Sequence, residues 1–349
     1  ASRTLLQWEG VTDENRVPYA LAPTTTTLAK SYAFDQDVAH LQNVYIINIH
    51  KNVTQVKREI MQHGSAGLGL YMDGTANYVG SAVYAETGEN VATYYCPTSS
   101  VTSNHAVNIV GWDDNFPASS FKNKPAGDGA WLCRNSWSDK TENNINSYFW
   151  LSYYDKSIED AAWIFDFESA DNYDYNYQYD GAMLYGYMGY GGSNKYANIF
   201  EAKANQDGSE NIKAVSFMTG RSTNLNYTVS IYTNLTDETN PESGTLAAQK
   251  SGITTYDGTY TVNLDSPVEI NEGNKFSVVV EVRNASGKTS YLAYERSMQS
   301  GMAGYWCTAS AKENQSFIAT PYGYWDDFGK ARSCNFIIKA FTDNETQTP

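Results

Sequence analysis

The chain has 349 residues, of which 41% are hydrophobic and 18% charged, and its formal net charge is -15. The length favours two domains, and 28 Tyr and 26 Gly beside so few charges favour β-rich, extracellular architecture over helical bundles. The acidic balance argues against nucleic acid and anionic membranes as partners, because nothing would neutralise their phosphates. No run of 18 apolar residues occurs, so the sequence predicts no membrane span.

The first elements along the chain alternate between helix and strand. Residues 1–9 resemble the end of a helix, and residues 44–49 are an apolar, β-branched run typical of a strand. Residues 54–63 carry apolar side chains at helical spacing, which predicts a short amphipathic helix. We expect Thr54 to be its N-cap and Gly64 to lie at its C-cap.

A second strand is predicted at residues 66–72, and its first residues are unusually small. Ala66 and Gly67 leave room for another backbone to approach closely. Two interpretations remain open at this point. The small residues either pack the strand against the preceding helix or line a substrate cleft.

The first half contains two cysteines, each of which is a candidate for a catalytic nucleophile. Cys96 ends an aromatic, strand-like run and precedes Pro97. A catalytic thiolate is favoured at a helix N-terminus, where the helix dipole lowers its pKa, so the sequence argues against Cys96 as a nucleophile. Cys133 lies in an apolar strand two residues before Asn135 and is expected to be a buried structural thiol.

The most informative stretch is residues 103–112, together with residues 131–137. Each is predicted to form a strand with a polar residue at one end, which is His105 in the first and Asn135 in the second. An Asn side-chain oxygen can accept a hydrogen bond from one imidazole nitrogen. That bond fixes the tautomer and orientation of the ring, so the other nitrogen can face a nucleophile. We therefore predict that the two side chains are hydrogen-bonded, with Trp137 packed over them.

The motifs Asn104-His105-Ala106-Val107, Val110-Gly111-Trp112 and Arg134-Asn135-Ser136-Trp137 resemble the His and Asn motifs of papain-like cysteine peptidases, in the same order and at a typical interval. The resemblance covers residues 1–165. It implies a catalytic pair of His105 and Asn135 that Trp137 supports. It also favours the cleft interpretation of the second strand and implies a substrate cleft lined by Ala66, Gly67, Asn104 and Ala106.

The nucleophilic Cys that this resemblance requires is not in the sequence. Papain-like enzymes place it about 130–150 residues before the His, which here falls before residue 1. An upstream segment or a companion chain is then expected to supply the Cys, the oxyanion donor and the central helix. Of these we expect a proteolytically processed enzyme with a noncovalently bound N-terminal companion chain. The chain alone is then expected to be inactive.

The sequence pattern changes after a polar, aromatic boundary segment at residues 168–180. Short alternating or β-branched runs are separated by turns, which is typical of an antiparallel β-sandwich; they cover residues 212–218, 227–233, 258–264, 276–282 and, as the last strand, 336–341. This order and texture resemble the lectin-like domain of some bacterial cell-surface cysteine peptidases. Two interpretations of the aromatic residues at 305–306 and 322–325 remain open: they stack on sugar rings or, as most are expected to do, pack the sandwich. Asp and Asn clusters offer oxygen ligands for a Ca²⁺ site, although no EF-hand spacing occurs.

Taken together, the sequence predicts an α+β chain of two domains. Residues 1–170 are expected to form the mainly β, His/Asn-bearing portion of a papain-like peptidase domain. Residues 178–349 are expected to form a lectin-like β-sandwich that folds on its own. Cys307 and Cys334 lie in the same half, and their disulfide state stays open. The predicted function is a secreted or cell-surface endopeptidase without a catalytic metal or cofactor. Its expected partners are a polypeptide substrate, the companion chain and a cell-wall or surface glycan. The alternative is a non-catalytic, carbohydrate-binding adhesin on an inactive peptidase fold.

Overall fold

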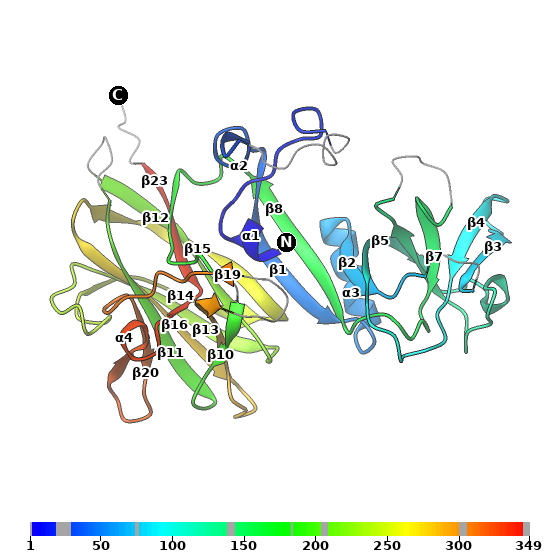
Figure 1. Cartoon of the computed structure of the whole chain (residues 1–349). Helices are drawn as coiled ribbons and strands as arrows, with labels where there is room; N and C mark the ends of the chain where they lie inside the picture. Colours follow the sequence, from blue (N-terminus) through cyan, green and yellow to red (C-terminus); the bar gives the residue numbers. More distant parts are fainter. Residues whose placement is uncertain are drawn as a thin grey trace. The chain divides into compact units, whose positions relative to one another are not determined.

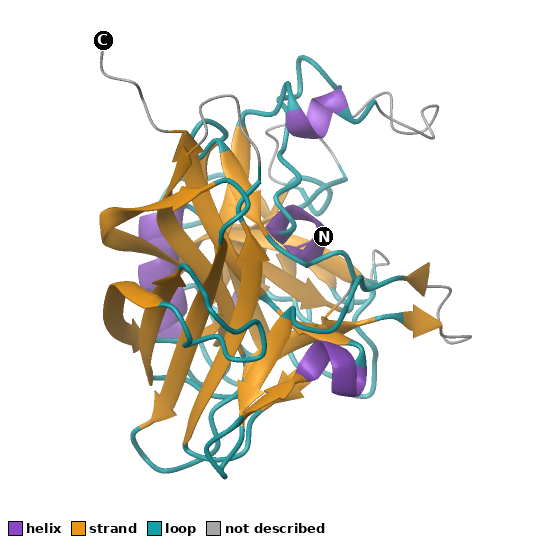
Figure 2. Cartoon of the chain, turned by 90° about the vertical axis from the view of Figure 1, so that its left-hand side faces the viewer, coloured by secondary structure: helices purple, strands orange, loops and turns teal. Residues whose placement is uncertain are grey.

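Strands dominate the structure, and its helices are few and short (Figure 2). The structure is a computed structural model and describes residues 2–18, 29–73, 77–137, 144–182, 184–203, 209–299 and 306–344. The chain forms two compact units. The central unit comprises residues 45–166, and the composite unit comprises residues 1–44 together with residues 167–349.

The central unit is built on a sheet whose strands follow the order β8-β2-β5-β6-β7-β4-β3 (Figure 1). Its strands are β2 (Ala66–Leu70), β3 (Val79–Val83), β4 (Asn90–Tyr94), β5 (His105–Asp113), β6 (Ala130–Arg134), β7 (Tyr148–Ser152) and the first part of β8 (Ala161–Ser169). The pair β4–β7 is parallel, and the other pairs described here are antiparallel. The helix α3 (Val53–His63) and the 3-10 helix η2 (Ala118–Ser120) complete the unit.

The helix α3 follows its predicted amphipathic pattern, with Val56 and Ile60 buried. It ends at Gly64, whose φ of +87° and N–H bond to the Ile60 carbonyl confirm the predicted C-cap. The predicted N-cap at Thr54 is wrong, because the helix begins at Val53 and Asn52 occupies the cap position. The preceding turn, closed by the bond from the Asn52 N–H to the Asn48 carbonyl, orders the chain before Thr54 is reached.

The composite unit contains two antiparallel sheets (Figure 1). The first has β9 (Tyr175–Tyr177), β10 (Leu184–Met188), β12 (Ser209–Thr219), β15 (Asp257–Asn271), β17 (Leu292–Arg296), β22 (Cys334–Phe336) and β23 (Ile338–Asn344). The second has β11 (Ser193–Glu201), β13 (Leu225–Thr233), β14 (Thr245–Thr254), β16 (Lys275–Asn284), β20 (Ser316–Ala319) and β21 (Trp325–Asp327). The short elements are β18 (Met298–Gln299), β19 (Trp306–Cys307), α1 (Ser2–Leu6), α2 (Ser31–Phe34) and α4 (Phe328–Arg332), and the strand β1 (Ala39–Asn48) has residues in both units.

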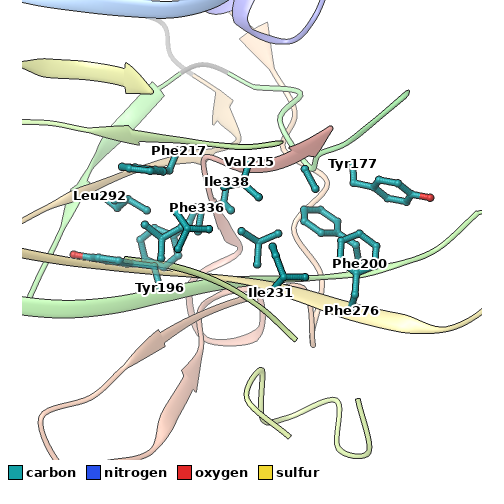
Figure 3. Packing of buried hydrophobic residues seen from close by; sticks show 14 of the residues in the cluster. Tyr177, Tyr196, Phe200, Val215, Phe217, Ile231, Phe276, Leu292, Phe336 and Ile338 are labelled. Atoms are coloured by element: carbon teal, nitrogen blue, oxygen red, sulfur yellow. The ribbon is translucent and has the colours of Figure 1, made fainter. Parts of the chain in front are cut away.

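One apolar core joins the two sheets of the composite unit. Phe217 and Ile338 enter it from the first sheet, and Tyr196, Ile231 and Phe276 enter it from the second (Figure 3). All five are almost completely buried, so their removal from water is the main force that holds the sheets together.

The strand predicted at residues 336–341 is divided in two. Phe336 ends β22 and Ile338 begins β23. The N–H of Ile337 bonds to the Ala293 carbonyl, and its side chain packs with Met218 in a separate small cluster. An apolar run cannot reveal such a change of partner strand, because every residue of the run is buried on either side of the break.

Within the composite unit, a buried lysine connects the N-terminal segment to residues 167–349. Lys339 is 2% exposed, and its ammonium donates to the Leu6 carbonyl and to Gln178 Oε1 at 2.8 Å. It also lies 3.3 Å from a carboxylate oxygen of Asp180. Trp8 packs on Phe341 of the same strand as Lys339, with ring centroids 5.6 Å apart.

Residues 1–44 contribute polar contacts to the first sheet as well. The Thr261 N–H donates to Asn43 Oδ1 at 2.6 Å, and the Thr261 hydroxyl donates to the Gln42 carbonyl at 2.9 Å. A fragment of residues 175–349 would lose these partners and the Leu6 acceptor of Lys339. Its independent folding, and the boundary between residues 170 and 178, stay predictions.

The four cysteines, all within the described residues, are free thiols, so Cys307 and Cys334 do not form a disulfide in the structure. Over the same part of the chain, no helix is long and apolar enough to cross a membrane.

We expect Lys339→Met to destabilise the composite unit by about 3 kcal/mol, because it removes the ammonium that lies 3.3 Å from the buried Asp180 carboxylate. Lys213→Met is the matched control. Its side chain is 38% exposed and its ammonium lies 3.7 Å from a carboxylate oxygen of Asp343, and loss of a surface pair should cost less than about 1 kcal/mol. Chemical denaturation of the whole chain measures both. Equal losses in the two variants would contradict the role assigned to Lys339.

Candidate active site

The register of two strands brings the predicted polar residues together. His105 begins β5, and Asn135 directly follows β6. The strands are antiparallel, and Asn108 pairs with Arg134, so the end of β6 lies beside the start of β5. His105 Nε2 is 2.8 Å from Asn135 Oδ1. The predicted hydrogen bond is therefore confirmed, and the catalytic roles of the two residues stay a prediction.

The Asn135 amide is held in one orientation by backbone groups. The residue is 2% exposed. Its Nδ2 donates to the Ile145 carbonyl at 2.7 Å, and its Oδ1 accepts the Ser136 N–H at 2.8 Å. Because Nδ2 has its own acceptor, the oxygen faces the imidazole, and an oxygen can only accept. His105 therefore donates from Nε2–H, and the neutral ring presents Nδ1 as its basic atom.

Trp137 packs against the imidazole as predicted, with ring centroids 4.6 Å apart at an interplanar angle of 44°. Trp137 therefore covers one side of the imidazole, while its own side chain remains 47% exposed. The contact limits the access of water to the His105–Asn135 bond without closing the site.

Cys96 and Cys133, the two cysteines of the first half, are poorly suited to act as the nucleophile. Cys96 is fully buried, and its thiol donates to the Thr98 carbonyl with Sγ 3.6 Å from the oxygen. Burial raises the pKa of the Cys96 thiol and also that of Cys133, which opposes formation of a thiolate. In the described residues, His105 Nδ1 has no hydrogen-bond partner, and no cysteine is bonded to His105.

The predicted cleft residues fall into different environments. Gly67 and Ala106 lie on an accessible face of the sheet, whereas the side chain of Ala66 is fully buried. The Asn104 amide pairs with the backbone of Met72, accepting from its N–H at 2.8 Å and donating to its carbonyl at 3.3 Å. This pairing fixes the chain next to His105. The assignment of the four residues to a substrate cleft stays a prediction.

The composite unit offers aromatic side chains at one of the two predicted sites. Tyr322 and Tyr324 are 86% and 58% exposed, and their rings are stacked with an interplanar angle of 12°. Trp325 instead packs against a core cluster, and Tyr305 and the Trp306 side chain lie outside the described residues. The described residues contain no group of three metal-ligating His, Cys, Asp or Glu side chains, and the Ca²⁺ site stays a prediction.

Comparison with known families assigns both halves of the chain. Residues 1–163 match the model of the papain family cysteine proteases, and residues 176–342 match that of the lectin like domain. The chain combines a papain-family peptidase domain with a lectin-like domain. The resemblance seen in the sequence is thereby confirmed, and the assignment as a peptidase rests on the same match. No curated protein sequence matches the chain.

Two solved structures are similar over nearly the whole chain. One is a variant of the clostridial cysteine protease Cwp84 after propeptide cleavage, with 27% identity and a TM-score of 0.78, covering 98% of this chain and 81% of that one. The other comprises the cysteine protease and lectin-like domains of Cwp84, a surface layer associated protein of Clostridium difficile, with 26% identity and a TM-score of 0.77, covering 99% and 72%. This likeness extends across both domains.

We expect Asn135→Ala to let the His105 imidazole change tautomer, because the acceptor that selects its Nε2–H form is removed. Correlation of the ring nitrogens with their protons by NMR should show one tautomer in the parent chain and a mixture in the variant. Asn108→Ala, which removes an exposed amide from β5, is the control and should keep the parent tautomer. An unchanged tautomer in Asn135→Ala would disprove the orienting role.

Proposed function

We propose that this protein is a cell-surface or secreted cysteine endopeptidase whose active site consists of a Cys thiolate, His105 and Asn135. The observation that carries the proposal is the 2.8 Å bond from His105 Nε2 to the fixed Asn135 oxygen, which leaves Nδ1 for the thiol. The family matches support the same chemistry. We interpret residues 176–342 of the composite unit as a lectin-like β-sandwich, in accordance with their two sheets and shared core.

In this mechanism, His105 Nδ1 takes the proton of the nucleophilic thiol, and the resulting thiolate–imidazolium pair is the resting state. The thiolate sulfur attacks the peptide carbonyl carbon. As the carbon–nitrogen bond breaks, Nδ1–H gives its proton to the leaving amine. A water molecule then attacks the thioester, with His105 taking its proton, and the acid product and the thiol are released. Throughout these steps Asn135 Oδ1 keeps the imidazole in place.

The thiol of this mechanism comes from a polypeptide outside residues 1–349 in our proposal. Cys96 and Cys133 are buried with raised pKa values, and neither is bonded to His105, which supports an external source. We propose an N-terminal companion chain, released by proteolytic processing and bound noncovalently. The similar Cwp84 structure was determined after propeptide cleavage, which shows that a relative of this fold is processed.

A surface location is proposed from the relative and from the composition. Cwp84 is a surface layer associated protein. A cell-wall or surface glycan is the partner that a lectin-like domain would bind. One observation favours the alternative of a glycan-binding adhesin without catalysis, which is the exposed, parallel pair Tyr322 and Tyr324, because sugar rings stack on such surfaces.

Labelling of the natively purified protein with a thiol-specific activity probe tests the proposal. We expect the label on a polypeptide other than residues 1–349, with intact mass under denaturing conditions identifying that chain. His105→Ala should lower the labelling rate by at least about 100-fold, because the thiol loses its base.

Cys96→Ser is the control and should label like the parent protein. Label on Cys96, lost in Cys96→Ser, would overturn the companion chain and restore Cys96 as the nucleophile. Glycan binding without any labelling would favour the adhesin.

A further inference from the structure

The outer face of the second sheet in the composite unit has a covered end and an open end. The strand β16 lies between β13 and β11 in this sheet. Val280 and Val282 of β16 belong to the shared core, so Val279, Glu281 and Arg283 point to the outer face. Val279 is buried in a small apolar cluster, whereas Glu281 is half-buried and Arg283 is exposed. The end of the face that carries Arg283 is therefore accessible to a ligand.

Two hollows adjoin on this open end, and both are lined by Glu281 and Arg283. The hollow over β13 has a volume of about 350 Å³ and is also lined by Asn226 and Thr228. The hollow over β11 has a volume of about 470 Å³ and extends to Gly287 in the hairpin after β16. Sites for small molecules have volumes of roughly 300–1,000 Å³, so each hollow has a suitable size. Because the two hollows share the residues of β16, one extended ligand can occupy both.

The strand register places hydrogen-bonding side chains on both sides of Arg283. It pairs with Asn226 of β13 and with Ser193 of β11, and cross-strand neighbours are about 5 Å apart. Within the described residues, neither the Arg283 guanidinium nor the Asn226 amide has a hydrogen-bond or ion-pair partner. A guanidinium presents five N–H donors and can hold a carboxylate or phosphate with two of them at once. These groups are therefore available to a ligand.

The other charged groups of this face already have partners. The Ser193 hydroxyl donates to Glu281 Oε1 at 2.9 Å, which orients the carboxylate as an acceptor for ligand hydroxyl groups. Lys195, the cross-strand neighbour of Glu281, lies 2.8 Å from a carboxylate oxygen of Glu242. Its charge is thereby compensated. Arg283 is left as the cation that an acidic ligand meets in the two hollows.

The residues of the two hollows favour one class of ligand. None of the described residues that line them is aromatic, so the stacking that many sugar-binding sites use is not offered there. The lining consists of hydroxyl, amide, carboxylate and guanidinium groups with small residues between them. Such a surface suits a ligand with many hydroxyl groups and at least one anionic group, and it offers little apolar area to a protein partner.

We propose that the two hollows bind a surface glycan that carries acidic groups, with Arg283 holding a carboxylate or phosphate of the glycan and Glu281 and Asn226 binding its hydroxyl groups. This inference rests on the proposed glycan partner, and it adds the chemical class of the glycan and its place on the composite unit. With a net charge of -15, the chain repels an acidic polymer over most of its surface, so binding needs an uncompensated cation such as Arg283.

Lys213 provides a matched control for the charge. It lies on β12 of the first sheet, and its side chain is 38% exposed. Lys213→Gln removes one positive charge from the same unit and leaves both hollows unchanged. An effect of net charge alone would appear equally in Lys213→Gln and Arg283→Gln.

The experiment measures Kd by calorimetric titration of the natively purified protein at physiological ionic strength, where charges more than about 8 Å apart are largely screened. The probes are two matched pairs, oligogalacturonate with its neutral methyl ester and phosphorylated oligomannose with the same sugar without phosphate. We expect at least one acidic glycan to bind more tightly than its neutral counterpart by about tenfold. The pair with the larger ratio identifies the acid as carboxylate or phosphate.

Arg283→Gln should remove this preference and leave the Kd of the neutral glycan within about twofold, because the hydroxyl contacts remain. Its free energy of unfolding should equal that of the parent, since the side chain is exposed. Arg283→Lys keeps the charge but cannot form the paired bonds, so it should show an intermediate preference. Asn226→Ala should weaken the acidic and neutral glycans alike.

Three results would overturn the inference. The parent protein could bind acidic and neutral glycans equally, Arg283→Gln could keep the preference, or Lys213→Gln could lose it to the same extent. In these cases the glycan partner stands and only this site is removed, whereas a parent protein that binds none of the four probes contradicts the glycan partner as well. Labelling by the thiol probe reports on the peptidase function separately. If Arg283→Gln does not fold, Arg283→Lys gives the second reading.

Discussion

The candidate active site depends on one buried amide. Asn135 can orient His105 only because its own Nδ2 is bound to the Ile145 carbonyl and its backbone N–H to the Ser147 carbonyl at 2.6 Å. An exposed Asn could turn its amide over and present Nδ2 to the ring, at little cost in free energy. Burial makes that exchange expensive, because each amide group would lose its partner without gaining water. The histidine's tautomer is therefore set by packing around the asparagine.

The sequence allowed the pair to be predicted because its parts are local. His105 and Asn135 each lie at the end of an apolar strand, and alternation along β5 predicts which residues are buried. The support of Asn135 was not predictable, because it comes from the carbonyl of Ile145, and a backbone carbonyl carries no sequence signal.

Local rules also failed where two of them competed. Thr54 is a good N-cap by type, yet the turn at Asn48 starts the helix at Val53. The apolar run at residues 336–341 satisfies the pattern of one strand, yet its partner changes from β17 to β12 between Phe336 and Ile338, which divides it. In both places the sequence predicted the right type of element. The ends of the helix and of the strands depend instead on hydrogen bonds to residues outside the segment whose pattern was used.

The family boundaries and the compact units divide this chain at different residues, and particular contacts explain the difference. Residues 1–163 match the peptidase family, but residues 1–44 form a compact unit with residues 167–349. Lys339 accounts for part of this difference, since its ammonium needs the Leu6 carbonyl as an acceptor in a buried site. Trp8 accounts for another part, because its ring lies against His40 and Phe341, which come from opposite ends of the sequence. A family model marks the residues that related sequences share, whereas these contacts determine which residues unfold together. Residues 1–44 therefore belong to the peptidase family match but pack with residues 167–349 in the composite unit. The stability of the composite unit thus depends on a segment from the peptidase half of the sequence.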